Sequence, residues 1–261
     1  MGSLAGKSPA STYKSLLKVV DETNGVNSDV EVVEDGEGTS SALGVGTNSI
    51  QVKPSAADDN ITFLVKNLGG TNLFKVDASN SAVTSGTTAT PVNSQILEFH
   101  VKGLVPSSAG RHMFVGRPFI AYAQHGVEIV GGTQTDPDTT HDTGDTADDL
   151  LQNLFLVPVN LTVDAVKFIV STSTDTDCII NVHLMSFDIT NAGGTDDGNL
   201  TNGTLLANGQ ATAVDRNVIK TVDCTIDSAN VAANKVIACF VENETNTDPI
   251  FLQTQVLYHF D

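Results

Sequence analysis

Residues 95–261 carry the pattern that most restricts what this chain can fold into. Eight short runs, in which apolar and polar residues tend to alternate, are separated by Gly-, Asn- and Asp-rich turns. Such alternation places successive side chains on opposite faces of a strand, whereas a helix needs a period near 3.6 residues. The pattern therefore predicts an all-β region without a convincing helix. The runs are 95–105, 117–130, 154–159, 164–172, 178–189, 217–226, 235–243 and 250–260.

The first and last runs indicate how these strands would pack. Leu97, Phe99 and Val101 alternate with charged or imidazole side chains, which gives one buried and one solvated face. The run 250–260 is apolar on both faces, because Phe251 and Leu257 lie opposite its larger apolar set. Eight antiparallel runs predict a two-sheet jelly-roll head domain over 95–261. The doubly apolar strand predicts that one outer sheet face is covered, in our interpretation by a neighbouring subunit.

The first 50 residues predict a polar N-terminal arm followed by a β-hairpin. Runs of β-branched residues at 15–22 and 28–34 flank a turn that contains Asn24-Gly25. A short amphipathic helix over 11–19 is the alternative for the first run.

Residues 51–83 predict a short β shaft. Its strands, such as the one with Phe63 and Val65 on one face, carry only two or three apolar residues per face. Such strands bury too little surface to be stable alone, and copies of the same chain are the simplest partner. Residues 84–94, with Gly86 and Pro91 and no apolar periodicity, predict a linker.

The charge balance excludes several classes of partner. The chain has 13 Lys and Arg against 31 Asp and Glu, a formal net charge of −18. Nucleic-acid binding and adhesion to an anionic membrane both need basic surfaces, so we expect neither. The first 20 residues contain no apolar run of signal-peptide length, and we expect neither a secretory leader nor a membrane span.

Catalytic signatures are missing from the sequence. It contains no GxSxG, HExxH, P-loop or GxGxxG motif, and it has no Trp to stack on a sugar ring. His100 and His183 fall on mixed or polar strand faces, which predicts solvated strand histidines. We therefore expect a protein that is not an enzyme and that needs no cofactor.

The most acidic segment, 131–149, is the one candidate metal site. Asp136, Asp138, Asp142 and Asp145 could supply carboxylate oxygens to Ca²⁺, although the spacing is not that of an EF-hand. The alternative, which we favour, is a solvated loop without metal.

The cysteines and a small basic cluster are two further groups of candidate residues. Cys178, Cys224 and Cys239 form no CxxC pair, and Cys178 and Cys224 continue apolar faces, so packing is the favoured role. Arg111-His112 and Arg117 form a local basic cluster, which predicts either contact with an anionic glycan or, preferably, pairing of Arg117 with a carboxylate.

Several segments resemble a known class of protein. The shaft segments of tailed-bacteriophage fibre and spike proteins are similar to residues 63–83, FLVKNLGGTNLFKVDASNSAV. The N-terminal parts of such proteins are similar to VVDETNG and VEVVEDGEGTSSALGVGTNSIQV. LFLVPVNLTVDAVKFIVST and ANKVIACFVEN resemble trimeric jelly-roll heads of the tumour-necrosis-factor and complement type. The heads often have an aromatic residue or Gly where this chain has Val159 and Asn160.

The resemblance implies a homotrimer on the outer surface of a virion. Residues 1–50 would contact the major capsid protein or other virion proteins, and the spike would decorate and stabilise the capsid. The short shaft favours this capsid role over its alternative, a tail fibre whose loops at 131–149 and 190–204 contact host glycan or protein. A cellular carbohydrate-binding jelly roll is a third interpretation.

Overall fold

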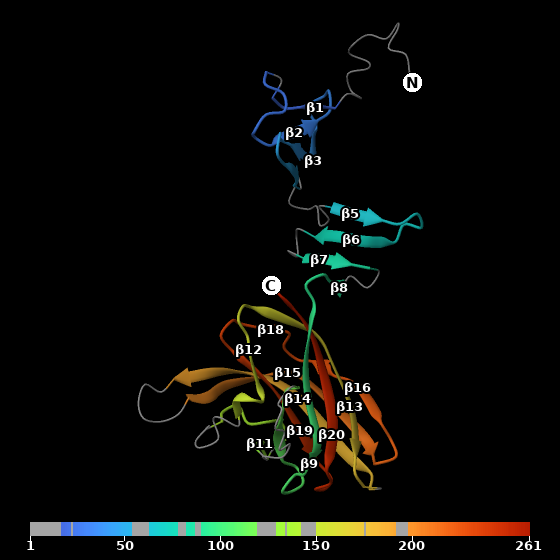
Figure 1. The fold of residues 1–261 in the computed structure, drawn as a ribbon, viewed down its shortest axis with the longest axis vertical. Coiled ribbons are helices and arrows are strands. Elements are labelled where there is room, and N and C mark those ends of the chain that lie inside the picture. Colours follow the sequence, from blue (N-terminus) through green and yellow to red (C-terminus); the bar gives the residue numbers. More distant parts are fainter. Residues whose placement is uncertain are drawn as a thin grey trace. The chain divides into compact units, whose positions relative to one another are not determined.

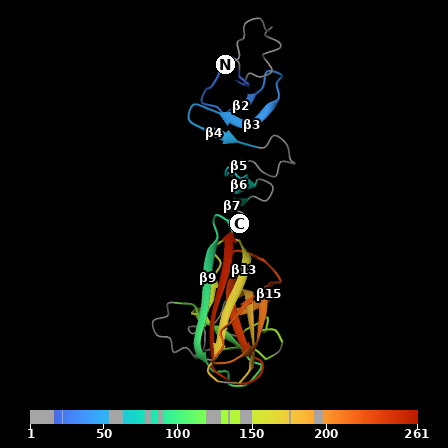
Figure 2. The same cartoon turned by 90° about the vertical axis from the view of Figure 1, so that its right-hand side faces the viewer.

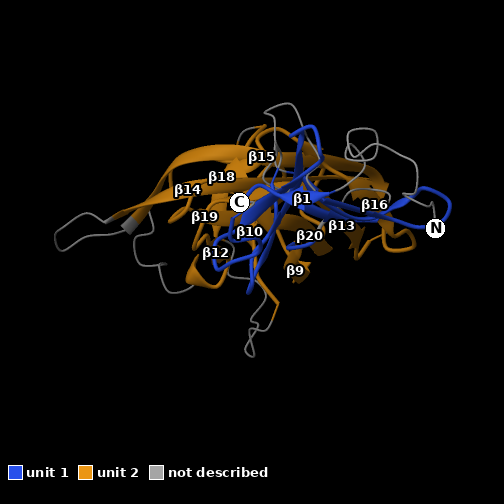
Figure 3. Ribbon diagram, turned by 90° about the horizontal axis from the view of Figure 1, so that it is seen from above, with its two compact units in different colours: residues 1–93 blue, residues 94–261 orange. Residues whose placement is uncertain are grey.

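The computed structural model describes residues 17–21, 23–53, 63–77, 82–86, 90–118, 129–133, 135–141, 150–174, 176–191 and 198–261. These residues form twenty strands in four antiparallel sheets, which confirms an all-β chain. The chain divides into two compact units, residues 1–93 and 94–261, which Figure 3 colours separately. None of the described residues belongs to a helix long and apolar enough to span a membrane.

Unit 1 contains two four-stranded sheets, in which each strand pairs with the next along the chain. In the first sheet Lys18 lies opposite Glu34, so the two β-branched runs form a hairpin, and residues 11–16 of the alternative helix lie outside the described residues. In the second sheet Phe63 lies opposite Val76. The strands are β1 (Lys18–Val19), β2 (Glu31–Glu34), β3 (Ser40–Val45), β4 (Ile50–Val52), β5 (Phe63–Lys66), β6 (Asn72–Asp77), β7 (Ala82–Ser85) and β8 (Thr90–Pro91).

The expected linker, 84–94, contains strand residues. Thr84 and Ser85 end β7, and they pair with Pro91 and Thr90 of β8. Gly86 follows β7 with a φ of +73°, a conformation that glycine adopts without steric cost. No strand signal is visible in the sequence here because β8 is a two-residue edge strand, where Pro is tolerated and no apolar face is needed.

The described part of unit 1 buries no large apolar side chain. The buried apolar residues of the described chain begin at Leu97, whereas Ile50 and Phe63 are 75% and 45% exposed. Both sheets of unit 1 therefore present apolar side chains without a core of their own among the described residues.

Unit 2 is built from two sheets. The larger has the order β11-β10-β19-β14-β15-β17, with β12 beside β19, and the smaller has the order β16-β13-β20-β9, with β18 beside β13. Strands β9, β20 and β13 of the smaller sheet run side by side (Figures 1 and 2), and one end of the β14–β15 hairpin projects to the side of them (Figure 1). The strands are β9 (Gln95–Leu104), β10 (His112–Val115), β11 (Val130–Gly132), β12 (Leu154–Leu156), β13 (Leu161–Thr172), β14 (Cys178–Asn191), β15 (Gly198–Val214), β16 (Lys220–Asp223), β17 (Thr225–Ile226), β18 (Asn230–Val231), β19 (Val236–Asn243) and β20 (Ile250–Phe260).

A single large core holds the two sheets together. Phe99 and Phe168 of the smaller sheet and Leu184 of the larger one belong to the same buried cluster, each no more than 1% exposed. The chain changes sheet repeatedly, for example between β9 and β10, β13 and β14, β15 and β16, and β19 and β20. Strands β14 and β15 instead form a long hairpin within the larger sheet.

Strand β15 was not expected, since 190–204 was interpreted as an exposed loop. The structure corrects this for 198–204, which pair with β14, while 192–197 lie outside the described residues. The error arose because Asn and Gly are typical turn residues. Here Gly203 serves close packing, because a Cβ at that position would lie 2.7 Å from Cε1 of Phe187.

Candidate functional site

The outer face of the larger sheet changes from apolar to polar along β14. Met185 and Phe187 belong to a second buried cluster, with Phe114, Leu150 and Phe240 among its members. Two and four residues earlier on the same face stand His183 and Asn181. The polar end of this face is the part of unit 2 where hydrogen-bonding side chains gather.

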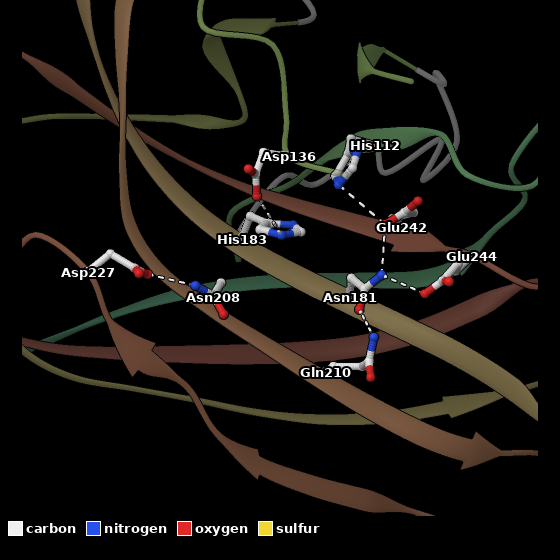
Figure 4. Close-up of polar contacts among 9 residues, drawn as sticks. All are labelled: His112, Asp136, Asn181, His183, Asn208, Gln210, Asp227, Glu242 and Glu244. Atoms are coloured by element: carbon white, nitrogen blue, oxygen red, sulfur yellow. Dashed lines mark hydrogen bonds and ion pairs between the residues drawn. The ribbon is translucent and has the colours of Figure 1, made fainter. Parts of the chain in front are cut away.

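A row of four polar side chains crosses four neighbouring strands there. Asn181 of β14 lies opposite Gln210 of β15 on one side and Glu242 of β19 on the other, and Glu242 lies opposite His112 of β10. The row is joined by side-chain contacts (Figure 4). Gln210 donates to Asn181 Oδ1 at 2.9 Å, and Asn181 Nδ2 donates to Glu242 Oε2 at 2.8 Å and to Glu244 Oε2 at 3.3 Å.

A second row runs beside the first. His183 of β14 lies opposite Asn208 of β15, whose amide donates to Asp227 Oδ2 at 2.7 Å. Nε2 of His183 is 3.7 Å from Oδ1 of Asp136, which belongs to the segment after β11. The His183 ring also lies against the ring of His112, so the two rows meet at a pair of imidazoles.

Burial decides the protonation of this pair. His112 has no solvent exposure, and its Nε2 is 3.4 Å from Oε2 of Glu242 without hydrogen-bond geometry. Burial, followed by the neighbouring His183, lowers the pKa of His112 to about 4. Burial also lowers the pKa of His183, although Asp136 and Asp227 oppose it, and burial raises the pKa of Glu242. Both imidazoles are therefore neutral at pH 7.

Most side chains of the two rows, but not His112, form the floor of a cleft of about 730 Å³. Its described lining carries three carboxylates and no Lys or Arg. The lining residues are Gly110, Thr133, Thr135, Asp136, Asn181, His183, Asn208, Gly209, Gln210, Glu242 and Glu244.

The candidate metal site is only partly described. Asp136 lies at the cleft, whereas Asp138 is exposed and its backbone N–H donates to the Gly131 carbonyl at 2.7 Å. Asp142 and Asp145 lie outside the described residues. Among the residues that are described, no group of three or more His, Cys, Asp or Glu side chains could hold a metal ion.

The other sequence-derived candidates have separate surroundings. The interpretation of His183 as solvated is wrong, because the residue is 6% exposed under the segment that carries Asp136, while His100 is half-buried. Arg117 packs over the Phe155 ring, with its Cζ 5.3 Å from the ring centroid, and donates to the Leu154 carbonyl. Arg111 donates to the Ser107 hydroxyl.

The three cysteines are free thiols. Cys178 and Cys239 are buried, and Cys224 is half-buried against the main core. Burial raises the pKa of the Cys224 thiol to about 12 and also raises that of Cys239. This environment is that of packing residues rather than nucleophiles.

The smaller sheet carries a different feature on its outer face. A groove of about 510 Å³ is lined by apolar residues, including Ile169, Ile219 and Phe251, together with polar ones such as Glu98. Ile169 and Ile219 are 41% and 75% exposed. Phe251, which the sequence placed on the second apolar face of the last strand, is half-buried in this groove.

Comparisons with known proteins identify no family. No protein-family model and no curated protein matches the chain. A CocE/NonD family hydrolase from Staphylococcus aureus superposes with a TM-score of 0.31 at 8% identity, over 69% of this chain and 39% of its own. An aminopeptidase from the marine sediment archaeon Thaumarchaeota archaeon superposes with a TM-score of 0.29 at 9% identity, over 71% of this chain and 38% of its own. The structure from Desmodium yellow mottle tymovirus superposes with a TM-score of 0.24 at 9% identity, over 64% of this chain and 86% of its own.

These likenesses carry no argument about fold or function, because the superpositions are poor. The chain spans about two fifths of the length of the hydrolase and the aminopeptidase.

Proposed function

We propose that this chain is a structural virion protein: a homotrimeric spike that decorates and stabilises the outside of a bacteriophage capsid. The observation that carries the proposal is the missing core of unit 1. Its described strands leave large apolar side chains such as Ile50, Phe63 and Val65 exposed and bury none fully. A protein that acts by being assembled, rather than by chemistry, accounts for such a segment.

The sheets of unit 1 need apolar burial to be stable. Fully burying a Val, Leu, Ile or Phe side chain contributes about 1.5–3 kcal/mol, and two- to four-stranded sheets need such burial to persist. Within one chain the described strands of unit 1 leave their large apolar side chains half-buried or exposed, so we assign the missing burial to a partner surface. Two further copies would do so for the shaft, and the capsid surface for residues 1–50.

Unit 2 supports the expected jelly-roll head. Eight of its strands (β9, β10, β13, β14, β15, β16, β19 and β20) alternate between the sheets except at the β14–β15 hairpin, which is the wrapping of a double-sheet jelly roll. The outer face of its smaller sheet, with Ile169, Ile219 and Phe251, is the surface that we assign to contact between subunits.

Native mass spectrometry of the full chain tests the assembly. We expect a species of about 82 kDa, three times the 27.3 kDa of one chain. Ile169→Asp should weaken the trimer, because it places a charge in the assigned contact. Ile189→Asp is the matched control, since Ile189 is 42% exposed but belongs to the larger sheet. A monomeric wild-type chain would overturn the trimer.

Quantitative mass spectrometry of purified virions tests the location. A copy number of tens of percent of the major capsid protein is the expected result. A ratio near one or two percent would instead support the tail fibre. Absence from particles would overturn the virion assignment.

A further inference from the structure

We propose that the polar cleft of unit 2 binds an organic cation through a primary ammonium or guanidinium group. The cleft lies within a single unit of one chain, so this inference goes beyond the structural role and does not rest on it. Three observations carry it: the charge of the lining, the direction of its hydrogen bonds, and an unpartnered buried imidazole.

The charge of the lining selects the sign of the ligand. Asp136, Glu242 and Glu244 line the cleft without a basic side chain among the described lining residues. Arg111, next in sequence to Gly110 of the lining, is engaged with Ser107 at 2.8 Å. Anionic ligands are therefore repelled, and a cation gains from all three carboxylates.

The hydrogen bonds of the floor leave more acceptors than donors. Both amide hydrogens of Asn181 are used, one on Glu242 and one on Glu244. Gln210 and Asn208 each direct an amide donor to a neighbouring oxygen, at Asn181 and Asp227. What remains is rich in carboxylate and amide oxygens, so the best complement is a group with several N–H donors, such as ammonium or guanidinium.

His183 provides the second, independent sign of a ligand. The residue is 6% exposed and lines the cleft, and its Nδ1 has no hydrogen-bond partner among the described residues. A buried polar atom without a partner is uncommon in native proteins and calls for an explanation. A donor brought by a ligand would be accepted by this neutral ring.

An organic cation fits better than a metal ion. The Asn181 amide nitrogen lies between Glu242 and Glu244 and donates to both, so an N–H group stands where a shared metal would need an oxygen. The volume of about 730 Å³ is also within the range of small-molecule sites rather than that of a single ion.

Isothermal titration calorimetry of the full chain at fixed ionic strength tests the site. The probes are 1,4-diaminobutane, its neutral analogue 1,4-butanediol, and Nα-acetyl-lysine methylamide. We expect the diamine to bind and the diol to give no heat of binding. Tighter binding of the lysine derivative would identify a peptide-borne ammonium as the ligand, and tighter binding of the diamine would identify a free amine.

Two variants localise the binding. Glu244→Gln removes one cleft carboxylate at constant shape and should weaken diamine binding at least tenfold. Asp188→Asn is the matched control, because Asp188 also accepts from an amide (Asn202 at 2.9 Å) but is not among the residues that line the cleft. Equal affinity of both variants, or equal binding of the diol, would overturn the proposal. The native mass of each protein is read separately, so loss of binding and loss of the trimer are distinguishable.

Discussion

The imidazole rings of His112 and His183 lie edge to face, with their centroids 4.9 Å apart and their planes at 60°. They come from β10 and β14, which are separated by β19, and Glu242 and Asp136 lie beside one ring each. Two titratable rings in such close contact cannot both be charged without cost. The pair therefore links the packing of the larger sheet to pH.

Stability should fall in acid because of His112. Its folded pKa of about 4 lies below the value of 6.5 expected in the unfolded chain, so between these values the unfolded state binds the additional proton. The contribution is complete above pH 6.5 and is lost as the pH falls toward 4, by up to about 3 kcal/mol. Urea unfolding at pH 7 and pH 5 measures the change.

The control for this prediction is His112→Phe, which keeps an aromatic ring at a site where neither imidazole nitrogen has a described hydrogen-bond partner. The variant should lose less stability than the wild type between pH 7 and pH 5. An identical acid dependence of the two proteins would show that His112 does not carry the effect.

Gly131→Ala should strongly destabilise unit 2. A Cβ at this position would lie 2.1 Å from Cε1 and 2.5 Å from Cδ1 of Phe240, whose ring is fully buried. To relieve this clash the Phe240 ring would have to move within the core, which lowers the free energy of unfolding by about 1–3 kcal/mol or more. Gly116→Ala is the control, because its Cβ would meet nothing closer than 3.5 Å. Thermal unfolding should separate the two variants by several degrees.

The alternation of apolar and polar residues predicted many strands of unit 2. The prediction failed where a strand lacks this alternation. Leu97, Phe99 and Val101 are buried as expected, since one solvated and one buried face leave a direct trace in sequence. Strand β15 left no such trace. Asn208, Gly209 and Gln210 line the polar cleft, and Gly203 and Gly209 leave no room for a Cβ, so this stretch of Asn and Gly resembles a series of turns.

The candidate site was largely missed for a related reason. Asp136 stands out in the sequence for its acidic neighbours, whereas Asn181, Gln210 and Glu242 meet only through the register of β14 with β15 and with β19. Register is fixed by packing across the sheets, which a single sequence does not display. The one available signal was polar residues at alternate positions, such as Asn181 and His183, on an otherwise apolar strand.

The thiols should react slowly in the native protein. Raising the pKa of Cys224 to about 12 lowers its thiolate fraction at pH 8 by roughly a thousandfold relative to a free cysteine. Cys178 and Cys239 are additionally shielded by burial. Labelling with iodoacetamide, followed by mass spectrometry, should give little modification natively and three adducts in urea. Rapid native labelling of Cys224 would contradict this environment.

Hydrogen exchange of unit 1 should reveal whether its sheets are covered. Strands with two open faces open readily, so their amides exchange rapidly unless a partner buries them. In the assembled protein we therefore expect β3 and β6 to be protected to an extent comparable with β13, whose apolar residues lie in the core of unit 2. Exchange mass spectrometry on peptides that span 40–45, 72–77 and 161–172 measures this. Exchange of the first two within seconds, beside a protected third, would mean that the apolar faces of unit 1 remain uncovered and that the shaft is not intertwined.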